Sequence, residues 1–166
     1  MTDSLPEFLA HSLALEHEAA ERYRELADIM ENNLNPEVGA VFRDMARFSG
    51  RHHHEIKARV GAMVLPELKS WQYRWATPPE ATDSLDIDFF MQPYNALRIA
   101  RDNELRGYKY YRQIAREAAD PEIKRLAEEF AQEERGHIAA LDKWLAQAHR
   151  PSETWEKDPE PVEVTD

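Results

Sequence analysis

The chain has 166 residues, enough for one domain with a substantial core, and its net charge of -11 argues against a nucleic-acid partner. It contains no cysteine, which excludes disulfides, thiolate zinc sites, iron–sulfur clusters and a cysteine nucleophile. The N-terminus lacks the features of a signal peptide and no stretch has the length of a membrane span, so we expect a cytoplasmic protein without a membrane partner.

Four segments place apolar residues at helical spacing. Ser4 and Glu7 have the spacing of a capping box, with Pro6 in the first turn. Asn35 and Asp120 are each followed by a proline, which is typical of a capped helix start. The predicted helices span about residues 5–32, 36–64, 93–119 and 121–148.

Two segments differ from these helices in composition. Residues 65–92 are rich in aromatic residues and proline, and we expect a crossover along the side of a bundle with one short helix around residues 67–75. Residues 150–166 are acidic, proline-rich and nearly free of aliphatic side chains, which predicts a disordered tail, with partner docking as the alternative. The bundle domain is therefore predicted for residues 1–149.

The chain repeats itself at the level of a helical hairpin. Residues 35–52 align without a gap with residues 120–137, so that the proline-capped starts coincide and a histidine falls on a histidine. The helix before each segment carries one glutamate in its apolar stripe, Glu16 in the first half and Glu104 in the second. Two such hairpins joined by a long connection between the second and third helices predict an all-α, antiparallel four-helix bundle.

The polar residues in the apolar stripes are predicted to meet in one layer. Glu134 and His137 are three residues apart, so they project from one face of their helix. At about 1.5 Å per residue, Glu16, His52 and Glu104 reach similar heights along the bundle. Buried carboxylates and imidazoles are costly without a partner, and a metal ion suits both. Iron or manganese fits these donors, with zinc as an alternative.

Three segments also carry a family resemblance: residues 15–23 (LEHEAAERY), 103–111 (NELRGYKYY) and 131–137 (AQEERGH). Over about residues 4–148 the chain resembles the rubrerythrin-type members of the ferritin-like, di-iron carboxylate superfamily. The resemblance implies a ferritin-like fold and five metal ligands that are also the catalytic residues. They are the terminal ligands Glu16 and Glu104, the bridging ligand Glu134, and the imidazole ligands His52 and His137.

Other positions follow from the same resemblance or lie near its motifs. Tyr23 and Tyr111 stand where the family has tyrosines that orient carboxylates, with a role as ordinary core aromatics as the alternative. His11 and His17 lie beside the apolar stripe, so we expect both at the surface.

The chain departs from the family pattern at Ser49, where a second bridging carboxylate is expected three residues before His52. His53 lies on the same face as Ser49 and could replace the lost ligand; alternatively, one of the three consecutive histidines points inward and the others are solvated. The site would then hold two metals unsymmetrically, hold one, or use water or an exogenous anion as the second bridge.

Three functions remain open from the sequence. The first is a non-haem iron oxidoreductase of peroxidase or ferroxidase type that reacts with peroxide or dioxygen; without a rubredoxin-like cysteine module, it needs an external electron donor. The second is a non-enzymatic bundle that binds or stores iron, zinc or manganese, and the third is a structural or interaction bundle with a decayed site. A surplus of aromatic residues in the crossover predicts a homo-oligomer, most simply a dimer. These residues are Trp71, Tyr73, Trp75, Phe89 and Phe90.

Overall fold

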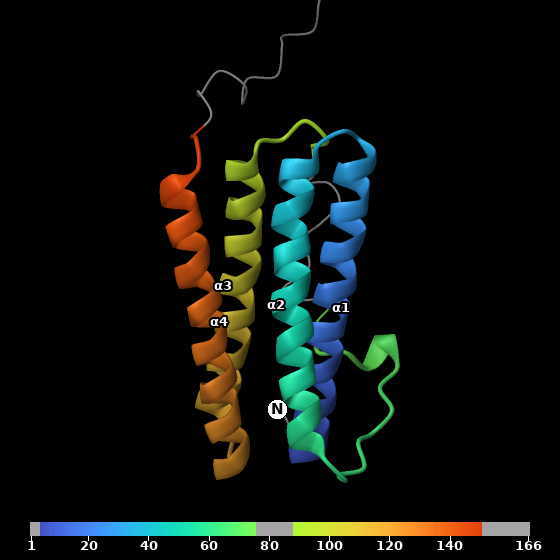
Figure 1. The fold of residues 1–166 in the computed structure, drawn as a ribbon. Coiled ribbons are helices and arrows are strands. Elements are labelled where there is room, and N and C mark those ends of the chain that lie inside the picture. The colour runs from blue at the N-terminus through green and yellow to red at the C-terminus, as the bar shows by residue number, and fades with distance from the viewer. Residues whose placement is uncertain (1–3, 76–87, 151–166) are drawn as a thin grey trace, which may run out of the picture.

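The computed structural model describes residues 4–75 and 88–150, which form a bundle of four helices (Figure 1). No strand occurs in these two ranges. The helices are α1 (Leu5–Asn32), α2 (Pro36–Val60), α3 (Pro93–Glu117) and α4 (Pro121–Gln147), and one 3₁₀ turn, η1, covers Ser70–Gln72. The predicted four-helix bundle made of two hairpins, α1–α2 and α3–α4, is therefore confirmed.

Local signals explain where most helices begin and end. The Ser4 Oγ accepts a hydrogen bond from the Glu7 backbone N–H (3.3 Å), and the Asp120 carboxylate accepts one from the Glu122 N–H (2.8 Å). Helix α2 stops at Val60, earlier than the boundary near residue 64 that the periodicity predicted. The reason is Gly61, whose φ of 53° lies in the region that favours glycine and ends a helix.

Asn35 does not cap α2 with its side chain, contrary to the sequence prediction. Its side-chain amide instead donates hydrogen bonds to the backbone carbonyls of Phe89 (3.2 Å) and Met91 (2.9 Å). These bonds fasten the end of the crossover to the turn between α1 and α2. As a result α3 starts at the same end of the bundle as α2, and the two helices run parallel (Figure 1).

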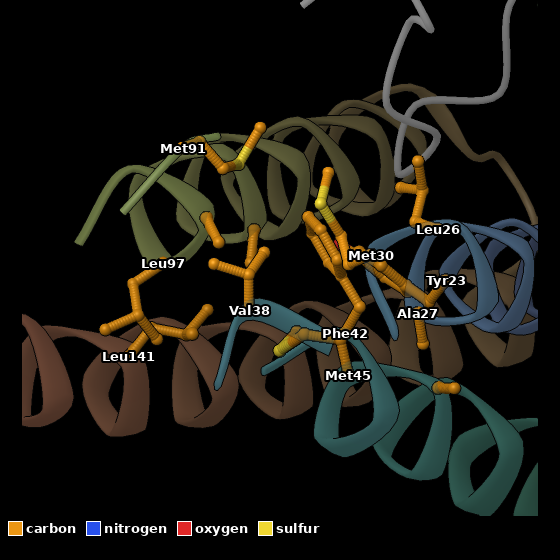
Figure 2. Close-up of a cluster of buried hydrophobic side chains, with 13 residues drawn as sticks. Tyr23, Leu26, Ala27, Met30, Val38, Phe42, Met45, Met91, Leu97 and Leu141 are labelled. Carbon is orange, nitrogen blue, oxygen red and sulfur yellow. The ribbon is translucent and has the colours of Figure 1, made fainter. Parts of the chain in front are cut away.

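Two clusters of buried apolar side chains occupy the two ends of the bundle. The cluster near the α1–α2 turn draws on all four helices and includes Tyr23, Phe42 and Leu141 (Figure 2). The second cluster surrounds Phe8 and Phe130 at the opposite end. Fully burying one such large side chain contributes roughly 1.5–3 kcal/mol to folding. The polar layer lies between these two clusters, where both hold its side chains in place.

The crossover buries one histidine that was predicted at the surface. His11 is buried because Trp75 packs edge-on against its ring (5.8 Å between centroids) and its Nε2 lies 3.4 Å from the Gln72 carbonyl oxygen. His17 is exposed, as predicted. The short helix expected in the crossover is reduced to the single turn η1.

Two further expectations concern the ends of the chain and the membrane. The predicted tail lies outside the described residues, apart from Arg150. Within the described ranges, no helix combines the length and apolar character needed to cross a lipid bilayer.

Candidate metal centre

The layer between the two apolar clusters holds the five residues that the sequence singled out as ligands. All four helices contribute, because each brings its polar residue to the same height. The five are Glu16 from α1, His52 from α2, Glu104 from α3, and Glu134 and His137 from α4. All are buried except His137, whose side chain is 21% exposed.

One half of the centre joins the two hairpins through His52. Its Nδ1 lies 2.8 Å from Glu16 Oε1 and 3.2 Å from Glu134 Oε1. Ligand atoms of these three residues lie within 4.8 Å of one another, which is close enough to share one metal ion. Two carboxylates and one imidazole form a donor set suited to iron, manganese or zinc.

The other half of the centre is built around His137. Its Nδ1 lies 2.9 Å from Glu104 Oε2 and 3.5 Å from Glu134 Oε2. These three residues form a second group whose ligand atoms lie within 4.8 Å of one another. Glu134 thus belongs to both groups, and each of its two oxygens faces a different histidine.

The hydrogen bonding of this layer fits a metal better than a purely structural polar cluster. In the described part of the chain, neither ring nitrogen of His52 and neither oxygen of Glu134 has a hydrogen-bond partner, although the atoms facing them are only about 3 Å away. Buried polar atoms without hydrogen bonds are costly and rare in folded proteins. Buried nitrogen and oxygen atoms that converge at these distances without well-directed hydrogen bonds form a donor set suited to a cation.

The electrostatics of the layer show which groups compete for protons. Burial raises the pKa of Glu104 to about 8, and the neighbouring Glu134 adds to the rise. Burial alone would also raise the pKa of Glu134, but the two histidines outweigh it and hold that pKa at about 2. Burial lowers the pKa of His137, yet Glu104 and Glu134 raise it overall to about 10. Without metal, protons on the imidazoles therefore balance the buried negative charge.

Glu16 and His52 follow the same pattern. Burial raises the pKa of Glu16 more than His52 lowers it. Burial opposes the protonated form of His52, but Glu16, Glu133 and Glu134 raise its pKa well above the ordinary value. A metal ion binding here would displace these protons.

The two tyrosines brace the terminal carboxylates across the bundle. Tyr111 on α3 donates its hydroxyl hydrogen to Glu16 Oε1 on α1 (3.3 Å). Tyr23 on α1 donates to Glu104 Oε1 on α3 (3.5 Å) and accepts a hydrogen bond from Asn103 Nδ2 (3.0 Å). Each hydroxyl thus contacts a candidate terminal ligand across the bundle, and both rings also fill the core.

The three consecutive histidines do not share one role. His52 is buried in the layer, whereas His54 is exposed. His53 is half-buried beside His17, with 6.0 Å between ring centroids, and it belongs to neither group of ligand atoms. Ser49 is buried one turn before His52. The structure therefore supplies no histidine in place of the carboxylate that Ser49 lacks.

The prediction from sequence missed two neighbours of the ligands. Glu133 Oε2 lies 2.9 Å from His52 Nε2, and Phe48 stacks on the ring of His137 with 5.0 Å between centroids. Positions 48 and 133 coincide when the two hairpins are aligned on their histidines. The repeat in the sequence therefore contained a signal for both positions. A phenylalanine and a glutamate differ too much in chemistry for the equivalence to be recognised from the sequence.

Comparisons with known proteins agree with this arrangement. The chain matches the Rubrerythrin family model over residues 7–92 and 95–165. It is 58% identical to an uncharacterised conserved protein from Magnetospirillum magnetotacticum MS-1, whose crystal structure it matches with a TM-score of 0.69 over 90% of this chain and 98% of that one. No curated protein matches the chain. With its ferritin-like bundle and its buried glutamate–histidine groups able to bind metal, the chain belongs to the rubrerythrin family.

Proposed function

We propose that this protein is a non-haem iron oxidoreductase of the cytoplasm that reacts with peroxide or dioxygen and takes electrons from an external donor. The observation that carries the proposal is the position of Glu134, whose two oxygens lie 3.2 Å from His52 Nδ1 and 3.5 Å from His137 Nδ1. A carboxylate shared in this way is suited to bridging two ions, and paired ions can act on both oxygens of a dioxygen species.

Each residue of the layer would have a distinct role in binding the metal ions. Glu16 with His52 would hold one ion, Glu104 with His137 the other, and Glu134 would bridge them. Iron bound there would supply the electrons that cleave an oxygen–oxygen bond. The two apolar clusters limit access of bulk water from either end, which strengthens the charge interactions inside the layer.

Ser49 gives the centre an uneven charge. The three carboxylates that would bind metal directly leave one of the four positive charges of two divalent ions unbalanced by ligands, because a serine stands where a fourth ligand carboxylate is expected. Glu133 lies beyond His52 and is not one of these ligands. That excess favours an exogenous anion in the layer, such as hydroxide or a deprotonated peroxide. We infer that the missing carboxylate helps to recruit the substrate.

The proposal is tested by loading the protein anaerobically with ferrous iron and counting ions per chain. Mixing with stoichiometric hydrogen peroxide should then oxidise the iron within seconds, followed by optical absorption. The Glu134→Gln variant should lose most of this reaction, whereas Glu128→Gln, an exposed change on the same helix, should keep it. A loaded protein whose iron does not react with peroxide or dioxygen would contradict the proposal.

The second candidate is metal binding or storage without catalysis, with iron, zinc or manganese as the ion. Ser49 favours it, since one carboxylate fewer weakens the hold on a second ion. Tight binding of a single zinc or manganese ion, together with iron that stays ferrous in peroxide, would select this candidate.

We also propose a homodimer as the assembled form. Trp71 is 79% exposed and Phe90 is 85% exposed, which is unusual for large apolar side chains on a monomer. Light scattering coupled to size-exclusion chromatography tests this expectation, and a monomer at all concentrations would contradict it.

A further inference from the structure

A row of aromatic side chains leads from the metal centre to the crossover. The Tyr111 ring lies 5.3 Å from the Tyr110 ring, and Tyr110 lies 5.5 Å from Trp75. Trp75 in turn stacks on Tyr73 at 5.3 Å, with an interplanar angle of 24°. All these distances join ring centroids, so adjacent rings are in or near van der Waals contact.

The inner end of the row touches the candidate ligands. The Tyr111 hydroxyl donates to Glu16 Oε1 (3.3 Å), and its ring lies 6.2 Å from the His52 ring. Both residues belong to one half of the metal centre. An electron on Tyr111 is therefore one short step from an ion held by Glu16 and His52.

The outer end of the row reaches solvent at the crossover. Tyr73 and Trp75 are half-buried. Burial raises the pKa of the Tyr73 hydroxyl, and the neighbouring Glu18 carboxylate raises it further. The Trp75 Nε1 is buried and has no hydrogen-bond partner among the described residues, so oxidised Trp75 would keep its proton. Trp71 is far more exposed than Trp75, but no ring contact joins it to the row within the described residues.

A second set of stacked rings in the same layer differs in one respect. Trp144 stacks on Phe48 (5.9 Å), which stacks on His137 (5.0 Å). Tyrosine and tryptophan side chains lose an electron at potentials that oxidised metal centres reach, whereas the phenylalanine ring does not. Phe48 thus interrupts this second path at the position where the first path has tyrosines.

We propose that Tyr111, Tyr110 and Trp75 form a one-electron relay between the metal centre and the crossover surface, where an external one-electron donor delivers its electrons. The inference rests on the proposed redox function and adds to it the place where the electrons enter. The donor is of the ascorbate or hydroquinone class, which releases one electron and one proton at a time.

The electrons and protons of the relay balance against peroxide. Reducing one hydrogen peroxide to two waters takes two electrons and two protons. Each transfer along the relay leaves Trp75 oxidised by one electron as a radical cation that keeps its buried N–H proton. The donor then returns one electron to Trp75 and releases one proton to solvent, from which the peroxide takes its protons. Two such cycles supply the two electrons and two protons that one peroxide needs.

The relay is tested on the full-length, iron-loaded protein with hydrogen peroxide and no reductant. Under these conditions the oxidised end of the relay should react with dioxygen or water and gain one or two oxygen atoms, which peptide mass spectrometry locates. We expect several-fold more of this modification at Trp75 or Tyr73 than at Trp71. Exposure alone would predict the reverse, because Trp71 is the most exposed of the three. Metal-free protein in the same peroxide should show no such preference.

Two variants separate the relay from a packing role of the same rings. Tyr110→Phe keeps the ring and its contacts with Tyr111 and Trp75 but removes the oxidisable phenol, so modification of Trp75 should fall several-fold while iron oxidation by peroxide continues. Phe48→Tyr should complete the interrupted path and bring modification to Trp144, since the new ring keeps its place between His137 and Trp144. Far-ultraviolet circular dichroism checks that both variants are folded.

The possible failures point to different conclusions. If neither peroxide nor dioxygen oxidises the bound iron, the proposed function is wrong, and the relay is overturned together with it. If iron is oxidised but modification follows exposure, with Trp71 modified first, the relay alone is overturned. Unchanged modification of Trp75 in Tyr110→Phe, or none at Trp144 in folded Phe48→Tyr, would also overturn it.

Discussion

Glu133 Oε2 on α4 lies 2.9 Å from the Nε2 of His52 on α2. The residue at the equivalent position of the other hairpin, Phe48 on α2, stacks on His137 of α4. Each histidine is thus supported by the same position of the opposite hairpin, once through a carboxylate and once through an aromatic ring. The two halves of the centre share a backbone plan but differ in what holds their imidazoles.

The contact between Glu133 and His52 predicts a specific loss. If His52 binds metal through Nδ1, a carboxylate on its Nε2 fixes the ring and raises its basicity. Glu133→Gln keeps the shape but removes the charge, so we expect metal affinity to fall by about 10-fold to 100-fold. Isothermal titration with zinc or manganese measures this effect without involving catalysis.

Glu129→Gln is the matched control for that experiment. Glu129 lies one turn earlier on α4 and contacts Arg59 and Arg125 at the surface rather than the histidines. Surface pairs of this kind contribute between about 0 and 1 kcal/mol, so its metal affinity should stay unchanged. Equal losses in both variants would show that Glu133 acts only through the overall negative charge.

Ser49→Glu should restore the carboxylate that the centre lacks. A carboxylate added at this buried position lowers the stability of the metal-free protein, because burying the charge and the added volume is costly there. With metal present, the variant should bind the second ion more tightly and recover its melting temperature. Ser49→Gln has the same size without the charge, so it should show only the part of the loss that comes from added volume, and no recovery with metal. Elemental analysis and thermal unfolding measure both effects.

The stability of the metal-free protein should fall as the pH rises above neutrality. The pKa of His137 is raised from 6.5 to about 10 and that of Glu104 from 4.5 to about 8, so both groups hold a proton more tightly in the folded state. Their stabilising effect is complete below 6.5 and 4.5, respectively, and is lost as the pH passes about 8 and then about 10. Solvent screening reduces the contribution of His137 to the stability, because its side chain is partly exposed.

The pKa of Glu134 acts in the opposite direction at the acidic end. It is held at about 2, below the ordinary 4.5, so its contribution is present above 4.5 and is lost as the pH falls towards 2. Melting temperatures recorded with a chelator across this range should therefore decline on both sides. Glu104→Gln should flatten the alkaline decline, and an unchanged alkaline decline in that variant would contradict the assignment.

Tyr23→Phe should destabilise the fold by roughly 1–3 kcal/mol, because Asn103 loses its buried acceptor and Glu104 loses a donor. Urea unfolding measures the change. Tyr94→Phe, at a half-buried position near the start of α3, is the control and should stay within about 0.5 kcal/mol of the parent. If Tyr23→Phe changed the free energy of unfolding no more than the control does, the Tyr23 hydroxyl would not contribute to stability.

Local sequence patterns were sufficient to predict the helices and which polar residues lie in one layer. The stripes of apolar residues, the proline-capped starts and the repeat predicted four helices in two hairpins, and the heights of Glu16, Glu104 and Glu134 followed from a constant rise per residue. These features depend on contacts within one helix or across one short turn. Such local contacts produce a periodic pattern in the sequence, so they can be predicted without the tertiary structure.

Other features depend on packing between elements distant in sequence, and only the tertiary structure decided them. His11 is buried because the crossover returns over α1, and Asn35 turns away from its helix to hold Met91. Which side chain lies against each histidine depends on how one hairpin faces the other, so Glu133 and Phe48 could not be found from either helix alone. The sequence by itself determined the bundle and the five residues of its polar layer, whereas the packing of the two hairpins decided what supports that layer.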